Sequence, residues 1–421
     1  MSQEMFSVVV FAAVIVVIIS EKLHRAVAAA AGAVLLILTK VLSLESSVSY
    51  IDFNTIGVLV GMMLFIAVVK NSGIFEYIAV KSAKIAKGVP WKIMVFYIII
   101  TAVFSAFLDN VTTVLLIGPM TIAITRILKI DPVPFLITQI IASNIGGTAT
   151  LIGDPPNIMI GSTAGLSFLD FLFNNGPVVV IILAASVLYF LILYKKQLVV
   201  DPQSAAAVLE LDEQKTIKDR PLLIKSIVMI ILVAVGFTIH DSLHLESSVI
   251  ALTAASIMLI IGGQNAEEII ADVEWPTIVF FISLFIVVGG MAESGAIDRL
   301  AGFLMHLTQG NTLVTMLVIL WASALLSAVL DNIPFVAALL PMIVSMGNSG
   351  MDVAPLWWAV SLGACLGGNG TLIGASANVV LSGISGRNGH PITFLHYLKV
   401  GFPLMIISIV ISTAYMLVRY S

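Results

Sequence analysis

Long apolar runs alternate with short polar stretches along the whole chain, and the runs form two matching series. The first series lies near residues 5–20, 26–43, 53–70, 92–128, 134–160 and 176–194. The second lies near residues 223–239, 247–262, 276–292, 312–346, 355–383 and 400–418. Because a helix needs about 17 to 25 apolar residues to cross the hydrocarbon core of a bilayer, these runs predict membrane-spanning helices.

Two polar motifs of the first series recur in the second. LDNVTTVLLIGPM (108–120) is answered by LDNIPFVAALLPM (330–342), and SNIGGTATLIGDPPN (143–157) by ACLGGNGTLIGASAN (364–378). The positions of Asp331 and Asp109 give an offset of 331 − 109 = 222, and those of Gly374 and Gly153 give 374 − 153 = 221. This nearly constant offset predicts a duplicated unit, with repeats over 1–195 and 223–421 and a charged linker over 196–222.

Composition fixes the environment of the chain. Of its 421 residues 59% are hydrophobic and 10% are charged, whereas a soluble domain has about 25% charged residues. We therefore expect an all-α polytopic membrane protein. The single cysteine excludes an intrachain disulfide and a cysteine-rich metal site. No Walker loop is present, so we expect neither ATP hydrolysis nor other enzyme activity from this chain, and we expect no nucleic-acid partner.

The distribution of Lys and Arg predicts the topology, because short cytoplasmic loops retain basic residues. The loop with Lys22 and Arg25, the lysines between 70 and 92, the loop with Arg126 and Lys129, and the linker are expected inside. Loops 44–52, 161–175, 240–246 and 347–354 contain no Lys or Arg and are expected outside. These placements agree if each half crosses five times and segments 92–128 and 312–346 turn back. We therefore predict two inverted repeats in a cell membrane, with about ten transmembrane helices, two re-entrant hairpins, two broken helices and both termini outside.

Each predicted hairpin turn carries an acid followed by an amide, Asp109-Asn110 and Asp331-Asn332. Helix N-termini favour anions, while carboxylate and amide oxygens suit Na⁺ or a proton. An acid at the middle of a bilayer costs about 2.5 to 3.5 kcal/mol. We therefore expect Asp109 and Asp331 to couple transport to Na⁺ or H⁺. The alternative is that both Asp-Asn pairs only form exposed turns.

The other two motifs predict broken helices, because glycine weakens a helix and proline removes a backbone donor. Unwound backbone at membrane depth is tolerated where it is buried in protein or lines a polar cavity. Asp154 of the first motif corresponds to Ala375 of the second, so ions should occupy the two sites unequally. The alternative is close helix packing by small residues. The candidate substrate- and ion-binding residues are Asp109, Asn110, Thr112, Thr113, Asn144, Gly146, Gly147, Thr148, Thr150, Asp154, Asn157, Asp331, Asn332, Gly367, Gly368, Asn369, Thr371, Ser376 and Asn378.

The strings DNVTTVLLIGPM, NIGGTATLIGDPPN, DNIPFVAALLPM and GACLGGNGTLIGASANVV resemble those of the ion transporter superfamily. The resemblance is to the branch of arsenical permeases, D-type sodium/proton antiporters and the melanosomal P-protein, and it is closest to the P-protein group. It implies an inverted-repeat fold, a homodimer and elevator-like movement. Dicarboxylate-transporting members have Ser-Asn-Thr at the hairpin tip, so Asp-Asn-Val and Asp-Asn-Ile argue against a dicarboxylate. The resemblance also implies sodium ligands at Asn110, Gly147, Thr150, Asn332, Gly368 and Thr371 and a substrate contact at Thr112.

These observations together predict a secondary active transporter for a small inorganic ion, coupled to Na⁺ or H⁺ and without a bound cofactor. No Lys or Arg lies near the motifs in the sequence, which disfavours a multivalent anion. Oxyanion, arsenite, chloride and Na⁺ all remain open as substrates. Two other classes also remain open, a passive anion channel and the membrane subunit of an arsenite efflux pump driven by a separate ATPase.

Overall fold

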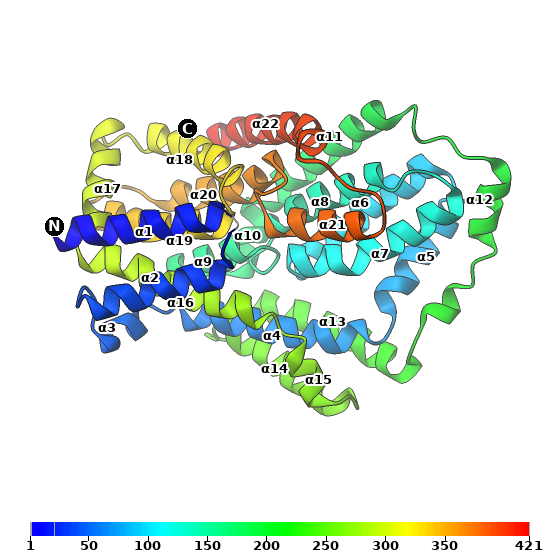
Figure 1. Cartoon of the computed structure of the whole chain (residues 1–421), viewed down its shortest axis with the longest axis horizontal. Coiled ribbons are helices and arrows are strands. Elements are labelled where there is room, and N and C mark those ends of the chain that lie inside the picture. The colour runs from blue at the N-terminus through cyan, green and yellow to red at the C-terminus, as the bar shows by residue number, and fades with distance from the viewer. Residues whose placement is uncertain (1, 21, 421) are drawn as a thin grey trace.

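The computed structural model describes residues 2–20 and 22–420, and every regular element in them is a helix (Figure 1). The first half contains α1 (Gln3–Ile19), α2 (Arg25–Leu38), α3 (Leu44–Ser49), α4 (Phe53–Lys70), α5 (Ile74–Ile85), α6 (Pro90–Phe107), α7 (Asn110–Leu128), α8 (Val133–Gly147), α9 (Pro155–Ala164), α10 (Phe168–Asn174) and α11 (Gly176–Tyr194). Between the halves lie α12 (Pro202–Leu209) and a 3-10 turn (Glu213–Thr216). The second half contains α13 (Arg220–Ile239), α14 (Ser247–Ile261), α15 (Ala266–Ala271), α16 (Trp275–Glu293), α17 (Ala296–Leu307), α18 (Thr312–Ser327), α19 (Asn332–Asn348), α20 (Ala354–Gly367), a 3-10 turn (Gly368–Gly370), α21 (Ser376–Arg387) and α22 (Phe394–Tyr420).

The order and the lengths of the helices recur from one half to the other. The first positions of α15 and α3 are offset by 266 − 44 = 222, and both helices have 6 residues. The first positions of α17 and α5 are offset by 296 − 74 = 222, and both helices have 12 residues. In Figure 1, α5, α6 and α7 lie on the right of the molecule, whereas their counterparts α17, α18 and α19 lie on the left. The apolar runs therefore predicted where the helices lie along the chain.

Several helices have the length and composition of membrane spans. Within residues 2–20 and 22–420, seven qualify individually, namely α4, α6, α7, α11, α13, α16 and α22. Helices α17 and α18 together form an eighth candidate, with a bend of 116° between them. Five other apolar helices have 10 to 17 residues. The prediction of a polytopic all-helical membrane protein is therefore confirmed, while the count of ten spans and two re-entrant hairpins stays a prediction.

Four interruptions separate helices where the motifs predicted them. Residues 108–109 join α6 to α7, and residues 328–331 join α18 to α19. Residues 148–154 separate α8 from α9, which begins with Pro155 and Pro156 in its first turn. Proline is tolerated there because the first turn has no internal hydrogen bond to lose. Residues 368–375, which begin with the 3-10 turn, separate α20 from α21 at the matching place in the second half.

Two of the candidate glycines allow neighbouring helices to approach closely. A Cβ atom at Gly146 would overlap the backbone of Ala102 on α6, and one at Gly367 would lie 2.6 Å from the carbonyl oxygen of Ala324 on α18. Small residues at such crossings bring membrane helices into contact. Gly146 and Gly367 thus have the packing role that we weighed as the alternative, and an ion-binding role for them stays a prediction.

The segment between the halves packs against α5. Lys84 Nζ lies 2.5 Å from Glu213 Oε2, and Lys218 Nζ lies 2.9 Å from Glu76 Oε1. The Lys84 ammonium lowers the pKa of the Glu213 carboxyl through its hydrogen bond. Gly73, which precedes α5, has a φ of 84°, and a Cβ atom there would overlap the carbonyl oxygen of Thr216. The linker backbone therefore packs directly against Gly73.

Replacing Gly73 by alanine should destabilise the protein more than the same change at its counterpart Gly295. Both glycines have a left-handed backbone, with φ of 84° and 79°, which costs a non-glycine residue about 1 to 2 kcal/mol. A Cβ atom at Gly295 meets nothing within 4 Å, whereas one at Gly73 overlaps the linker. We expect a clearly lower Tm for Gly73→Ala than for Gly295→Ala in detergent. Equal losses would mean that the linker does not rest on Gly73.

Candidate functional site

The turn between α6 and α7 is held by its acid and its amide. Asp109 caps the N-terminus of α7, since its carboxylate accepts hydrogen bonds from the Thr112 backbone at 2.8 Å and from the Thr112 hydroxyl. Asn110 is buried, and its Nδ2 donates to Asn144 Oδ1 at 3.0 Å. Thr113 is buried on α7. The turn is therefore integrated into the protein interior, which disfavours the exposed-turn alternative.

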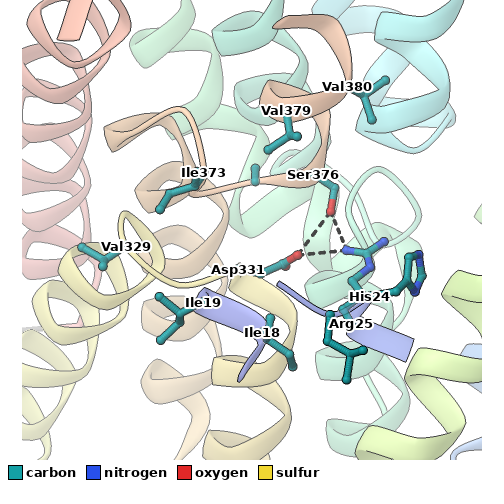
Figure 2. Close-up of a pocket in the computed structure, with 12 residues that line it drawn as sticks. Ile18, Ile19, His24, Arg25, Val329, Asp331, Ile373, Ser376, Val379 and Val380 are labelled. Carbon is teal, nitrogen blue, oxygen red and sulfur yellow. Dashed lines mark hydrogen bonds and ion pairs between the residues drawn. The ribbon is translucent and has the colours of Figure 1, made fainter. Parts of the chain in front are cut away.

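The turn between α18 and α19 is held differently, by a basic residue. Asp331 caps α19 through the Ile333 backbone at 3.2 Å. Its Oδ2 also accepts from Arg25 Nη1 at 2.9 Å and from Ser376 Oγ at 3.2 Å, and Figure 2 shows the three side chains converging. Arg25 Nη1 donates further to Ser376 Oγ at 2.7 Å. An ion pair thus connects the second tip to the first residue of α2.

Arg25 corrects two expectations from the sequence. We expected it in a loop, but it is the first residue of α2, where its guanidinium contacts Asp331 and lies 5.1 Å from the ring centroid of Phe280. The predicted cytoplasmic side of this turn stays a prediction. We also expected no basic residue near the motifs. That expectation was wrong, because Arg25 lies far from Asp331 in the chain and only folding brings them together. The argument against a multivalent anion that rested on the absence of a basic residue therefore loses its basis.

Asn144 on α8 connects the two halves at the centre of the protein. Its side chain is fully buried, and its Oδ1 accepts from Asn110. Its Nδ2 donates to Asn369 Oδ1 and to Asn378 Oδ1, each at 2.9 Å. Four candidate asparagines, two from each half, therefore form one hydrogen-bonded cluster. Such a buried network is stabilising when its members are satisfied and costly when one is removed.

Two further asparagine contacts hold the unwound backbone of the broken helices. Asn157 Nδ2 donates to the carbonyl oxygens of Gly147, Thr148 and Thr150 at 3.2, 3.3 and 2.9 Å. In the second half Asn378 Nδ2 donates to the carbonyl oxygens of Gly368 and Thr371 at 2.8 and 2.9 Å. These two side chains satisfy carbonyl groups that a continuous helix would have paired internally.

The hydroxyls of the broken segments also bond to backbone. Thr150 donates to the carbonyl oxygen of Ala106 and Thr371 to that of Ala328. Thr148 donates to the Asn144 carbonyl at 2.7 Å. The proposed sodium ligands Gly147, Thr150, Gly368 and Thr371 are therefore already engaged in holding the fold. A carbonyl oxygen has a second lone pair, so a cation could still bind beside these contacts.

A small cavity of about 30 Å³ lies between the two hairpin tips, and we call it the inner cavity. This volume is about that of one water molecule. Its polar lining comes from both halves of the chain. In the described residues no group of three or more acids, histidines or cysteines is placed to hold a metal ion unaided. A cation here would need amide or backbone oxygens as well. The polar residues around the inner cavity are Arg25, Asp109, Asn110, Asp154, Glu274, Thr277, Asn332 and Ser376.

Asp154 is the most buried acid of the inner cavity, with 1% of its surface exposed. Its Oδ1 accepts a long hydrogen bond of 3.4 Å from Asn332 Nδ2. Its Oδ2 has no hydrogen-bond partner among the described residues. A buried polar atom without a partner is costly. Asp154 is therefore the group of this cavity best placed to receive a proton or a cation.

Glu274 was not among the predicted site residues, although it also lines the inner cavity. It precedes α16, and its Oε2 accepts from Thr277 Oγ1 at 3.1 Å. Thr277 Oγ1 in turn accepts from Arg25 Nη2 at 3.1 Å. Its counterpart in the first half is Asp52, which caps α4 (274 − 52 = 222). This matched pair of acids before α4 and α16 was the signal that could have identified Glu274.

An open cleft of about 410 Å³ lies on the other side of Arg25. Figure 2 shows it bordered by Ile18 and Ile19 at the end of α1, by Val329, and by Val379 and Val380 on α21. Its polar lining consists of His24, Arg25, Asp331 and Ser376. The cleft is thus mainly apolar, and its charged groups gather where it meets the second hairpin tip.

The comparison with known protein families agrees with this architecture. The model of the CitMHS family, described as "Citrate transporter", matches residues 15–363, which include both hairpin tips and the first broken helix. The chain belongs to this family of membrane transporters. What the family description says of citrate concerns the family, and the substrate of this member is treated below as a proposal.

Curated relatives cover most of this CitMHS chain. An uncharacterized transporter of Mycobacterium tuberculosis is 41% identical over 374 residues, 88% of this chain and 87% of the relative. A 46 kDa membrane protein of Mycobacterium leprae is 40% identical over 373 residues, with the same coverage of 88% and 87%. The human P protein is 32% identical over 458 aligned positions, 90% of this chain and 55% of the relative. The resemblance to the P-protein group is therefore confirmed.

Proposed function

We propose that this CitMHS member is a secondary active ion transporter that works by alternating access. The observation that carries the proposal is the inner cavity, where the tips of two hairpins from different halves meet around a buried carboxylate with an unpartnered oxygen. Transporters built from repeats bind substrate and coupling ion near the middle of the bilayer at the interface of the repeats. Both tips, both broken helices and the asparagine cluster converge in this region.

The coupling ion of the proposal is Na⁺ or H⁺, bound in the inner cavity. Asp109, Asp154 and Glu274 provide carboxylates, and Asn110 and Asn332 provide amide oxygens. A site of about 30 Å³ suits a bare cation or a proton on a carboxylate, and it is too small for an organic substrate. Hard cations prefer oxygen ligands of this kind. Binding would neutralise Asp154 and remove the cost of its unpartnered oxygen.

The proposed movement is an elevator-like exchange between two oppositely directed halves. In Figure 1 the hairpin of α6 and α7 lies on the right and that of α18 and α19 on the left, and they approach each other at the centre. The N-terminus lies at the left edge and the linker with α12 at the right edge. The lysines of α5 and the linker also lie on the right, which supports a cytoplasmic linker and external termini. The homodimer is proposed from the family resemblance.

The substrate of the proposal is a small ion, and the presence of Arg25 makes an anion acceptable. Arg25 is the basic residue of both the cleft and the inner cavity. The family description names citrate, a multivalent anion, whereas the acid-rich inner cavity opposes several negative charges at one point. We therefore propose that an anionic substrate binds on the Arg25 side of the site and that the coupling cation binds on the Asp154 side.

Flux into proteoliposomes tests the proposal against a channel and against an ATPase-driven pump. The purified chain, without ATP, is given citrate, arsenite, chloride or Na⁺ at equal concentrations on both sides, and a Na⁺ or pH step is then applied. We expect saturable accumulation of one of these ions against its own gradient. Flux that never runs uphill would identify a channel, and uphill transport that requires added ATPase and ATP would identify a pump subunit.

A further inference from the structure

The ion pair of Arg25 and Asp331 lies between the open cleft and the inner cavity. Arg25 and Ser376 border both spaces. Asp331 borders the cleft, and the next residue, Asn332, borders the inner cavity. The cluster of Arg25, Asp331 and Ser376 is therefore a wall shared by the two spaces, and Figure 2 shows its side chains in contact. The direct route from the cleft into the inner cavity therefore runs past these three side chains.

Arg25 also connects the α2–α16 pair to the second hairpin tip and to α21. Its helix, α2, packs against α16, where Thr277 accepts from Nη2 and Phe280 lies under the guanidinium. Its Nη1 contacts Asp331 at the second hairpin tip and Ser376 at the start of α21. The planar fork of an arginine can hold several oxygens in fixed positions, which a lysine cannot do. The Arg25 side chain therefore holds the second hairpin tip and α21 against the α2–α16 pair.

The first hairpin tip has no equivalent of this arginine contact. The residue that corresponds to Arg25 is Ser247 (247 − 25 = 222), and the one that corresponds to Ser376 is Pro155 (376 − 155 = 221). No basic residue of the described chain forms an ion pair with Asp109, which is held by its own helix. The repeat therefore does not require an arginine here for folding. The ion pair therefore holds the second hairpin tip and not the first.

We propose that Arg25 is a gating residue, whose ion pair with Asp331 closes the inner cavity toward the cleft and must separate when the cavity opens on that side. This inference rests on the proposed transport function. The side chains are 23% and 14% exposed, so the pair lies on the wall of the open cleft and is not sealed in the protein interior. A pair in this position is strong enough to hold a closed state and weak enough to open.

The test measures how fast a thiol in the inner cavity reacts with a reagent in solution. Ile333, which lines this cavity, is replaced by cysteine, and the protein in lipid nanodiscs is treated with 2-aminoethyl methanethiosulfonate. The native Cys365 is buried, and the parent chain measures its contribution. We expect Arg25→Gln to raise the rate at Ile333→Cys by about tenfold or more, as a shift of one decade in the open population would do. Arg25→Lys should stay nearer to the parent rate, because it retains the charge.

Three controls separate gating from general loosening. Thr277→Val removes one partner of Arg25 but keeps the ion pair, so its rate should remain slow. Asp331→Asn removes the other partner of the ion pair and should raise the rate as Arg25→Gln does. With two pair-breaking variants, the test remains decisive if one of them folds poorly. Val379→Cys, which lies in the cleft and is 45% exposed, should react at one rate in every background. An unchanged rate at Ile333→Cys in both pair-breaking variants, or an equal rise with Thr277→Val, would overturn the proposal. Because this assay involves no transport, its result is independent of the flux experiment.

Discussion

Replacing Asp154 by asparagine is expected to reduce cation-coupled transport strongly while the protein remains folded. The side chains have nearly the same shape, so packing at the break before α9 should survive. The change removes the one charge that is both buried in the inner cavity and without a partner for its Oδ2. A lost contact to a charged group is worth about 1.5 to 3 kcal/mol, so cation affinity should fall roughly 10- to 100-fold. Uphill flux at a fixed Na⁺ or proton gradient measures the loss.

Asp131→Asn is the matched control for this prediction. It makes the same chemical change at a side chain that is 59% exposed in the loop before α8. We expect wild-type flux from this variant. Full uphill flux from Asp154→Asn would show that the buried carboxylate does not bind the coupling ion. Equal loss in both variants would point to a nonspecific effect of charge.

Asp109→Asn isolates the charge of the first tip in the same assay. Asparagine caps a helix about as well as aspartate, so α7 should keep its N-terminus. We expect a loss of coupling here as well, because Asp109 lines the inner cavity. Asp331→Asn should differ, because it frees Arg25 and opens the proposed gate. Its expected result is leak, seen as dissipation of the substrate gradient. Identical behaviour of the two variants would show that the tips are equivalent.

The positions of the helices could be predicted from the sequence because each apolar run is long and the breaks after α8 and α20 are marked by glycine or proline. Pro155 and Pro156 cannot continue α8, and they begin α9 instead. The constant offset between the two halves added a second, independent test of the boundaries. Asp109 and Thr112 even have the spacing of a capping pair. These are local properties of the chain, so the sequence contains them directly.

The contacts made by single side chains across the fold could not be predicted in the same way. Arg25 follows a short polar stretch and looks like an ordinary loop charge that sets orientation. Only the packing of α2 against α16 brings it to Asp331. Gly146 has the same ambiguity, because a glycine in a motif fits a binding loop and a close helix crossing equally well. Its neighbour Ala102 reveals the packing role, and that neighbour lies on a different helix, α6.

The asparagines were recognised as candidates, but their actual partners were not. Amide side chains bind ions and also bind backbone, and composition does not distinguish the two uses. In the structure Asn157 and Asn378 hold the unwound segments. Asn144 holds the halves to each other. Much of the conspicuous polarity of the motifs thus maintains the broken helices. Among the candidate residues that the structure describes, Asp154 Oδ2, Asn369 Nδ2 and Thr113 Oγ1 are buried without a partner.

Asn144→Ala should therefore destabilise the protein more than any single substitution at the ion-binding acids. The change leaves Asn110 Nδ2, Asn369 Oδ1 and Asn378 Oδ1 without their shared partner in a fully buried position. Each unsatisfied buried group costs about 1 to 3 kcal/mol, so a total loss of about 3 kcal/mol is a conservative expectation. The measurement is the Tm of the purified protein, together with uphill flux, which should fall because the first hairpin tip and the second broken helix lose their shared hydrogen-bond partner.

Asn388→Ala is the matched control, since Asn388 Nδ2 donates to the Ile384 carbonyl at 2.9 Å at the end of α21, within its own helix. Its Tm should change little. Asn144→Ala combined with Asn369→Ala should lose less than the two single losses together, because both remove the same hydrogen bond. Additive losses would mean that the two asparagines act separately. A wild-type Tm for Asn144→Ala would show that the asparagine cluster does not hold the halves together, and the shared site between the hairpin tips would then need another support.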